Sequence, residues 1–233
     1  MIIDMHYHTE VTSNGQLRTE DLLAYAKRTR LIERAREKGL DAICLTEHDR
    51  IWPLEAVQAL REQYAFPVFR GMEVSTNYAA YGHVLVYGME TYIGGMWYVE
   101  KLQRYVQEAN GVMFVAHPFR ELLTWSFNPN HKIVTVEEGC AWPVFKMVHG
   151  MEVYNGGTVD KENEMALEVC RRLNLLALGG SDAHSVIGVG ACVSIFEKEI
   201  STQEQLLEEL RTGRFQAGVY RRGQFVPVDQ LGG

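Results

Sequence analysis

The sequence predicts an α/β fold built on a mainly parallel sheet or barrel. Short apolar runs alternate along the chain with segments whose apolar residues recur at helical spacing. No stretch has the composition of a linker, a repeat or a low-complexity tract, so we expect a single domain over residues 1–233. A chain of this length buries roughly 70% of its unfolded surface, so it needs no structural metal merely to fold.

The expected strands are short and apolar, and most helices between them are rich in good helix formers. The strands cover residues 2–7, 41–46, 68–73, 83–87, 111–116, 150–154, 175–179, 191–196 and 215–220. The helices cover residues 17–38, 54–64, 96–109, 161–173 and 202–211. Residues 122–149 fit neither pattern, and we interpret them as an insertion that forms a lid or a substrate wall.

The composition disfavours several functional classes. The net charge of −7 gives no general attraction for nucleic acid, so a stable nucleic-acid partner is not expected. The four cysteines form no Cys-x-x-Cys pair, and we expect buried thiols at Cys44, Cys140, Cys170 and Cys192. No apolar run has transmembrane length and no signal-peptide pattern begins the chain, so we expect a cytoplasmic protein without a membrane partner.

The first polar motif lies in the first expected strand and contains Asp4, His6 and His8. Alternate residues of a strand project from the same face, so these three side chains would point the same way. Two imidazoles at that spacing can chelate one metal ion, and Asp4 could orient a ring nitrogen or act as a ligand. Taken alone, the motif is equally consistent with a polar strand end.

Further polar residues stand near the ends of other expected strands. His48 follows the run at 41–46, Glu73 ends the next strand, His83 begins another, and His117 stands where Pro118 stops a fifth. Singly, His48 is more simply a loop residue and His83 a structural histidine. In a barrel, however, the carboxyl ends of the strands form one face, where active sites are built.

Asp182 and His184 form the last motif and repeat the two-residue spacing of the first. Six of the eight histidines fall within these segments, and His131 and His149 do not. A random distribution would rarely place so many histidines beside strand ends. Mixed imidazole and carboxylate ligands suit Zn, Mn or Fe better than Mg or Ca.

The combined motifs resemble the PHP superfamily, the polymerase-and-histidinol-phosphatase family of metal-dependent phosphoesterases. The matching segments follow the family order and comprise residues 4–8, 46–49, 73, 83, 116–118 and 181–184. They run from residue 4 to residue 184 and so cover most of the chain. The family resembled is that of its short stand-alone members.

The resemblance implies a distorted (β/α)7 TIM-like barrel with two or three divalent transition metals, Mn, Fe or Zn, at the C-terminal ends of the strands. Carried over by position, the ligands form three groups: His6, His8, Glu73 and Asp182; Glu73, His83 and His117; and His48 with His184. Glu73 has two carboxylate oxygens and would bridge the first two metals.

Two positions depart from the family pattern. Members often carry an aspartate ligand of the third metal where this chain has Asn14, which offers only a neutral oxygen. Glu10 is the nearby alternative, so the occupancy of the third position stays open. Glu47 stands where aspartate is usual, which is a milder change.

The implied function is hydrolysis of phosphate esters by a metal-bound hydroxide, on a small phosphorylated substrate such as a phosphomonoester, a nucleotide or a short oligonucleotide. Asp182 and His184 join the bridging glutamate as catalytic candidates, and Arg120 is the candidate phosphate clamp. Glu152 and Asn155, around the end of the strand at 150–154, could shape the substrate pocket.

Two alternatives remain at this stage. An amidohydrolase-like barrel also opens with His-x-His, but it tends to use a bridging lysine, and Lys146 is not at a strand end. A non-catalytic metal-binding scaffold is the second alternative. Such domains usually show eroded ligand sets, whereas this set is nearly intact.

Overall fold

The computed structural model of the chain describes residues 1–11, 17–78, 82–123 and 134–231. The α-helices are α1 (Thr19–Thr29), α2 (Leu31–Lys38), α3 (Leu54–Tyr64), α4 (Val99–Glu108), α5 (Val136–Cys140), α6 (Asp160–Leu173) and α7 (Gln203–Thr212). The strands are β1 (Ile2–Tyr7), β2 (Ala42–Leu45), β3 (Val68–Arg70), β4 (Met72–Thr76), β5 (Gly82–Tyr87), β6 (Val112–Val115), β7 (Gly150–Asn155), β8 (Leu176–Gly180), β9 (Cys192–Phe196), β10 (Phe215–Arg221) and β11 (Gln224–Pro227). Short 3-10 helices are η1 (Pro143–Lys146) and η2 (Val228–Gln230).

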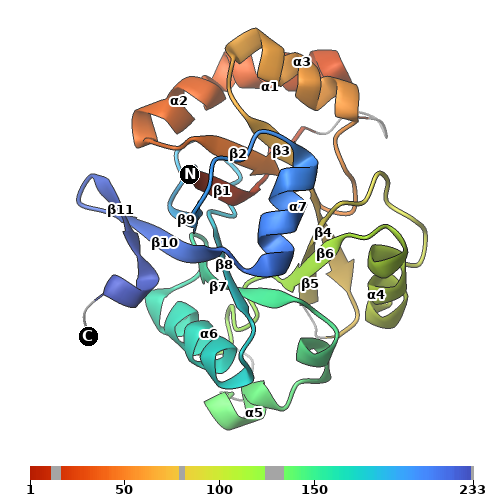
Figure 1. The fold of residues 1–233 in the computed structure, drawn as a ribbon, viewed down its shortest axis with the longest axis vertical. Coiled ribbons are helices and arrows are strands. Elements are labelled where there is room, and N and C mark those ends of the chain that lie inside the picture. Colours follow the sequence, from red (N-terminus) through yellow and green to blue (C-terminus); the bar gives the residue numbers. More distant parts are fainter. Residues whose placement is uncertain (12–16, 79–81, 124–133, 232–233) are drawn as a thin grey trace.

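The strands pair into two sheets (Figure 1). The larger has the order β11-β10-β9-β1-β2-β3, and the smaller has the order β4-β5-β6-β7-β8. β1 to β3 run parallel, as do β6 to β8, whereas β9 to β11 and β4 to β5 join their neighbours in antiparallel fashion. The predicted α/β class is confirmed, but the described strands pair as two sheets and not as one closed seven-stranded barrel.

Backbone hydrogen bonds join the two sheets at the ends of β1 and β2. Just after β8, the Asp182 N–H donates to the His6 carbonyl at 2.7 Å. Just after β2, the Glu47 carbonyl accepts from the N–H of Glu73 in β4 at 3.1 Å. These bonds hold the polar strand ends of both sheets against one another, which is what brings distant motifs to one place.

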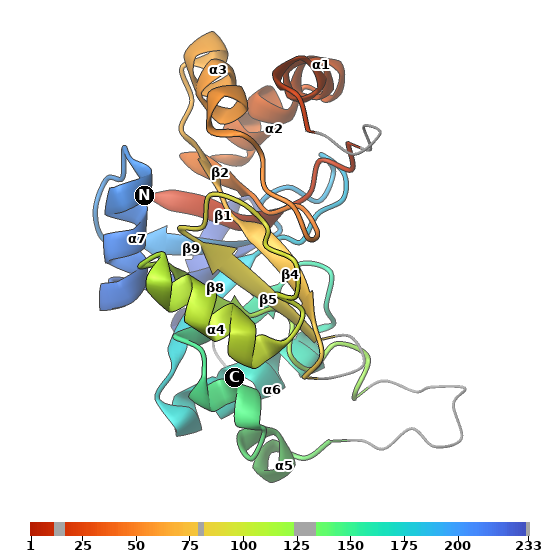
Figure 2. The same ribbon diagram turned by 90° about the vertical axis from the view of Figure 1, so that its right-hand side faces the viewer.

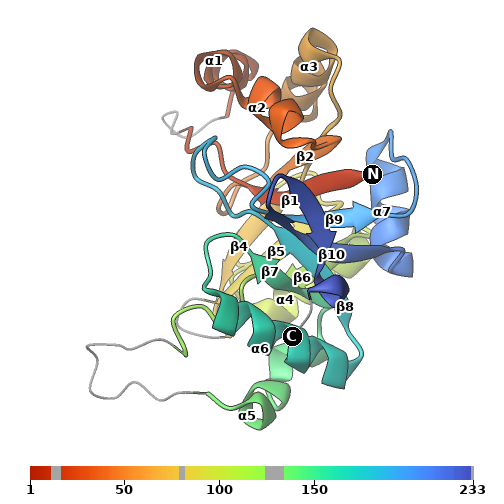
Figure 3. The ribbon, with the colours of Figure 1, turned by 90° about the vertical axis from the view of Figure 1, so that its left-hand side faces the viewer.

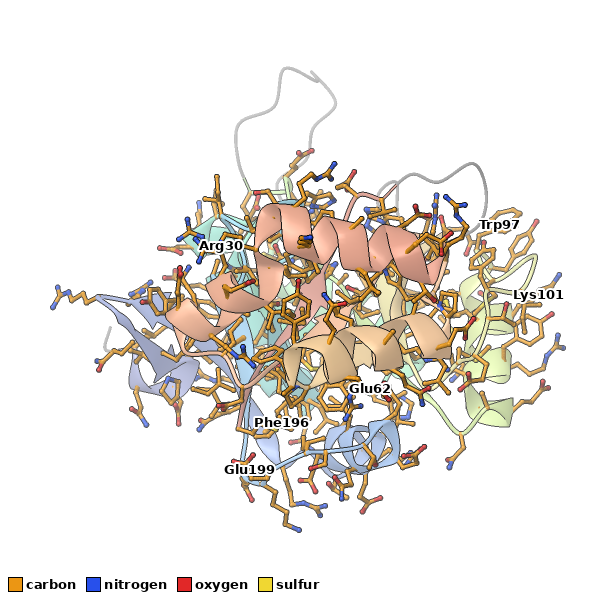
Figure 4. All side chains as sticks on the ribbon, turned by 90° about the horizontal axis from the view of Figure 1, so that it is seen from above. Arg30, Glu62, Trp97, Lys101, Phe196 and Glu199 are labelled. Atoms are coloured by element: carbon orange, nitrogen blue, oxygen red, sulfur yellow. The ribbon has the colours of Figure 1, made fainter. Side chains whose placement is uncertain are left out.

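The helices cover the outer faces of the two sheets. The hydrophobic core has three parts, one of which lies between the sheets. In Figures 2 and 3, α1, α2 and α3 occupy one end of the molecule, while α5 and α6 occupy the other. Seen from above, α1 and α3 lie side by side, and Arg30 marks the turn between α1 and α2 (Figure 4). Between the sheets, side chains of both pack together with α7, among them Met5, Leu85, Phe114 and Leu206.

Two expected elements are each broken into two. The helix expected at 17–38 divides at Arg30, which has a left-handed φ of 56°. The change of direction lets the apolar residues of both halves reach one core. The strand expected at 68–73 divides at Gly71, where an added Cβ would lie 2.6 Å from the Tyr87 ring, so this close approach requires glycine.

The other expectations have mixed outcomes. Cys44, Cys170 and Cys192 are buried as predicted, whereas Cys140 is only half-buried. Of the insertion predicted at 122–149, residues 124–133 lie outside the described residues; η1 follows them and buries Val144. None of the helices in the described part of the chain combines the length and the apolar character needed to cross a membrane.

One buried hydroxyl connects β8 to β9, which are not ladder neighbours. The Ser194 Oγ accepts from the Gly179 N–H at 3.0 Å and donates to the Gly179 carbonyl at 2.9 Å. Ser194 is fully buried, and a Cβ at Gly179 would approach the Val193 carbonyl oxygen to 2.3 Å. The hydroxyl therefore replaces the ladder hydrogen bonds that the contact between these strands lacks.

We expect Ser194→Ala to lower the free energy of unfolding by about 1–3 kcal/mol, because it leaves the N–H and carbonyl of Gly179 buried without this partner. Urea denaturation followed by circular dichroism measures the change. The exposed Ser201→Ala is the control and should change stability by less than about 0.5 kcal/mol. Equal stabilities for the two variants would contradict the role of this hydroxyl.

Candidate metal centre

The predicted ligands converge at one end of the two sheets, although they come from segments up to 178 residues apart in the sequence. His6 and His8 lie on and just after β1, and Asp182 follows β8. Glu73 lies on β4. Because β5 runs antiparallel to β4, the start of β5 lies at the same end, and Ser75 pairs with His83 across the two strands.

The first group of ligands is compact and fully formed. Metal-binding atoms of His6, His8, Glu73 and Asp182 all lie within 4.8 Å of one another. His6 Nε2 is 3.0 Å from His8 Nε2 and 3.3 Å from Glu73 Oε2. Asp182 Oδ1 is 3.3 Å from each of the two imidazole nitrogens. The structure thus brings together the four residues expected at the first metal position.

The second group surrounds the other oxygen of Glu73. Glu73 Oε1 lies 2.9 Å from His83 Nδ1 and 2.9 Å from His117 Nε2, the residues expected at the second metal position, although His117 is in none of the described sets whose ligand atoms all lie within 4.8 Å of one another. His48 Nδ1 is 3.0 Å from Glu73 Oε2, and His48, Glu73 and His83 form a further possible ligand set. His48, which the sequence assigned to the third position, therefore also reaches the bridging carboxylate.

The third group contains His8, His48 and His184, whose ligand atoms lie within 4.8 Å of one another. The three rings are mutual neighbours: the His8 ring centroid lies 4.5 Å from those of His48 and His184, which are 5.9 Å from each other. Glu10 Oε1 is 3.3 Å from His184 Nε2. Asn14, the other candidate for this position, lies outside the described residues.

The polar atoms of the centre are better placed to coordinate a cation than to form hydrogen bonds with one another. Glu152 Oε1 lies 3.0 Å from His6 Nδ1, so this nitrogen donates and His6 Nε2 keeps its lone pair. Among the buried side chains that the structure describes, Glu73 Oε2 and His83 Nδ1 have no hydrogen-bonding partner, although other polar atoms lie about 3 Å away. Such convergent lone pairs fit a shared divalent cation.

The electrostatics also favour positive charge at the centre. Burial lowers the pKa of His6, but the carboxylates, Asp182 first and then Glu152, raise it well above its ordinary value. Burial raises the pKa of Glu73, yet the nearby His6 brings it well below its usual range. For His8, burial lowers the pKa, but the adjacent carboxylates of Asp182 and Glu73 outweigh it and raise the pKa to about 8. A proton or a metal cation would satisfy the same carboxylates.

Two predicted residues contact different partners from those expected. Asp4 is buried, and its carboxylate accepts from the backbone N–H groups of His6, Ser181 and Gly190, so it fixes the backbone around the ligands and not an imidazole ring. Arg120, the candidate phosphate clamp, forms an ion pair with Asp182. Its guanidinium therefore holds a predicted metal ligand and leaves 29% of the side chain exposed.

Glu47, one of the two departures from the family pattern, ties two of the ligand segments together. Its Oε1 accepts from the Thr9 N–H at 3.0 Å, from the Thr9 hydroxyl, and from the Trp52 Nε1–H at 2.9 Å. Thr9 directly precedes Glu10, and Glu47 directly precedes His48. Glu47, which is longer than the aspartate usual at this position, thus holds Glu10 and His48 on the same side of the centre.

Sequence reasoning assigned Glu152 only to the substrate pocket, whereas the structure places it against His6 and His117. The signal that could have found this role is a single acidic residue inside the otherwise apolar run Gly150–Tyr154, because a buried carboxylate needs partners. Lys146, the bridging residue of the amidohydrolase alternative, is exposed on η1 and belongs to none of the ligand groups found among the described residues.

Comparisons with known proteins agree with this fold. Residues 160–215 match a family model described as PHP-associated. The structure is similar to that of a "putative metal-dependent phosphoesterase" from Bifidobacterium adolescentis, with 18% identity, a TM-score of 0.55, and coverage of 91% of this chain and 96% of that one. PsfC from Pseudomonas syringae has 18% identity and a TM-score of 0.55, with coverage of 91% and 93%.

A third similar structure is an amidohydrolase from Chromobacterium violaceum, solved with bound sulfate and no metal. It has 17% identity and a TM-score of 0.52, and the likeness covers 78% of this chain and 87% of that one. No curated protein sequence matches the chain. At such low identities the structural likenesses concern the fold. The match over residues 160–215, with the histidine and carboxylate motifs assembled in family order, supports membership of the PHP superfamily.

Proposed function

We propose that the protein is a metal-dependent phosphoesterase that acts on a small phosphate ester with two or three divalent cations, Mn, Fe or Zn. The position of Glu73 carries the proposal. Its Oε2 lies 3.1 Å from His8 Nε2 in the first group, and its Oε1 lies 2.9 Å from His117 Nε2 in the second. A carboxylate so placed can bridge two cations, an arrangement suited to in-line displacement at phosphorus.

When bound, such cations activate a water molecule and offset charge on the phosphoryl oxygens. The protein side chains would do the rest. The carbonyl of Asp182 accepts from His184 Nδ1 at 3.1 Å, so the half-exposed imidazole presents Nε2. We propose that Nε2 helps to hold a third cation or, where that position is empty, donates a proton from the imidazolium to the leaving oxygen. Arg120 uses Nη2 on Asp182 and Asn155, and its Nε–H donates to the Thr158 hydroxyl at 3.3 Å. We propose that its remaining N–H donors bind a phosphate oxygen.

Several observations support this class without naming the substrate. The similar Bifidobacterium protein is called a "putative metal-dependent phosphoesterase", and the Chromobacterium structure holds sulfate, an anion of phosphate-like shape. The two sheets, joined where β1 meets the end of β8 and where β2 meets β4, fit an opened form of the (β/α)7 barrel. We propose one domain in which 122–149 forms a substrate wall, with phosphomonoesters, nucleotides or short oligonucleotides as candidate substrates.

An amidohydrolase reaction is the second candidate, and the likeness to the Chromobacterium structure favours keeping it. Glu73 takes the bridging position that a lysine tends to occupy in that class. A non-catalytic metal-binding scaffold is the third candidate, and the nearly intact set of ligands argues against it. Parallel assays on phosphate esters, amides and lactones separate the three.

The proposed function is tested by metal analysis combined with a phosphate-release screen. We expect the purified protein to carry two or more Mn, Fe or Zn ions per chain and to hydrolyse an aryl phosphate, because the ligand groups are preformed. A panel of metabolite phosphates, assayed with Mn²⁺ and with Zn²⁺, then identifies the substrate class. Metal-loaded protein that is inert on every phosphomonoester and phosphodiester would contradict the proposal.

His117→Ala should remove one ion and lower phosphatase activity by more than about 100-fold, because loss of a ligand exceeds the effect of losing an outer partner. The measurements are metal content by mass spectrometry and kcat/KM for the aryl phosphate. His149→Ala is the control, since His149 contacts the backbone N–H of Met113 and belongs to none of the described ligand groups. Two ions and full activity in His117→Ala would show that His117 is not a ligand.

Glu10→Gln tests the third position, because the Glu10 carboxylate is 3.3 Å from His184 and the amide carries no charge. At a Mn²⁺ concentration that just fills the third position of the wild-type protein, we expect the wild type to bind three ions and the variant about two, because the affinity for the third is lowered by about 10-fold or more. Glu55→Gln, on the exposed face of α3, is the matched control. The same stoichiometry in all three proteins would exclude Glu10 as a ligand.

A further inference from the structure

Glu152 is a fully buried carboxylate in the middle of β7 that contacts two predicted metal ligands at once. Its Oε1 lies 3.0 Å from His6 Nδ1, and its Oε2 accepts from the backbone N–H of His117 at 3.0 Å. His6 belongs to the first group of ligands and His117 to the second. Glu152 is therefore shared by both metal positions without being within the ligand groups themselves.

On the first side, Glu152 determines how His6 presents its ring. Because Nδ1 donates to the carboxylate, Nε2 is the nitrogen left to face Glu73 and Asp182. The backbone is shaped to permit this contact. A Cβ on Gly180 would lie 2.4 Å from the His6 Cβ and 2.8 Å from Glu152 Oε1, so only glycine allows the two side chains to meet there.

On the second side, Glu152 holds a strained backbone. His117 has a left-handed φ of 28° and precedes Pro118, a combination that ordinary residues avoid. Its N–H is fixed by Glu152 Oε2, and in this conformation its Nε2 lies 2.9 Å from Glu73 Oε1. Without that acceptor, the backbone at His117 would lose the interaction that offsets its strain.

The carboxylate is itself held in place. Asn155 Nδ2 donates to Glu152 Oε2 at 2.8 Å, and the Asn155 amide oxygen accepts from Arg120 at 2.8 Å. Arg120 in turn pairs with the ligand Asp182. These bonds link Glu152 to a third ligand segment and fix Oε2 on the side of His117, which leaves Oε1 to His6 Nδ1.

We propose that Glu152 is a positioning residue that couples the two metal positions. It acts on the first through the His6 side chain and on the second through the His117 backbone. The inference rests on the proposed metal centre and assigns no new substrate. Its distinguishing consequence is that the two carboxylate oxygens serve different ions. A substitution that preserves only one oxygen should therefore separate the two effects.

Glu152→Gln and Glu152→Ala provide that separation. Glutamine has one acceptor oxygen where the carboxylate has two. That oxygen satisfies more donors when it accepts from the His117 N–H and Asn155 Nδ2, which turns the NH2 group toward His6 Nδ1, where a donor faces a donor. We expect Glu152→Gln to bind the second ion nearly as wild type does and the first about 10- to 100-fold more weakly. We expect Glu152→Ala to weaken both ions by that factor.

Stepwise cobalt(II) titration, followed by visible absorption and calorimetry, measures both steps and needs no substrate. Glu162→Gln is the matched control, because Glu162 is also a buried carboxylate that accepts a backbone N–H, here from Leu123. Thermal melting of each variant without added metal checks folding. If Glu152→Ala fails to fold, the Glu152→Gln titration still decides.

Wild-type affinities in both steps for Glu152→Gln would overturn the coupling role. The coupling role would also be overturned if Glu162→Gln weakened cobalt binding as much as Glu152→Gln does, because the effect would then not depend on contact with the ligands. Suppose that the wild-type protein binds two cobalt ions and that Glu152→Gln weakens only one of the two binding steps. If the wild-type protein then hydrolyses no phosphate ester, the coupling role stands and the proposed function fails. A wild-type protein that binds no cobalt removes both.

Discussion

The buried carboxylate of Glu73 is the constraint on which the rest of the centre depends. A charged group with no exposed surface costs several kcal/mol unless opposite charge is supplied nearby. Five imidazoles lie within 3.3 Å of its two oxygens: those of His6, His8, His48, His83 and His117. The chain must therefore bring segments from both sheets to this one side chain, and the bonds between the sheets at β1, β2 and β4 follow from that need.

The backbone is strained at several points beside the proposed ligands. Positive φ angles occur at Glu10, Asp49, His117 and Asp182, which are four of the ten non-glycine residues with this conformation in the described part of the chain. Such conformations cost about 1–3 kcal/mol each and persist only where surrounding contacts hold them. Here, buried carboxylates accept the backbone N–H groups of these loops, as Glu152 does for His117. The polar network thus stabilises the strained loops that direct several side chains to one point.

Most of the centre was predictable because it follows from local rules. Alternation along β1 placed His6 and His8 on one face, and strand ends supplied the other ligands. The separation into two sheets, the reversed β5 and the contacts of Glu152 were not predictable, since they depend on pairings between residues far apart in the sequence. Arg120 shows the same limit, because its position after β6 indicates a polar loop but not that Asp182 is its partner.

The central place of β1 in the larger sheet has a consequence for biosynthesis. β1 pairs with β2, which follows soon after, and with β9, which begins at Cys192. Ribosomes add about 5–20 residues per second, so this strand waits roughly ten seconds or more for its second neighbour. The strands beyond β1 in the larger sheet, β9, β10 and β11, can therefore join it only late in synthesis, and until then one edge of β1 has no ladder partner.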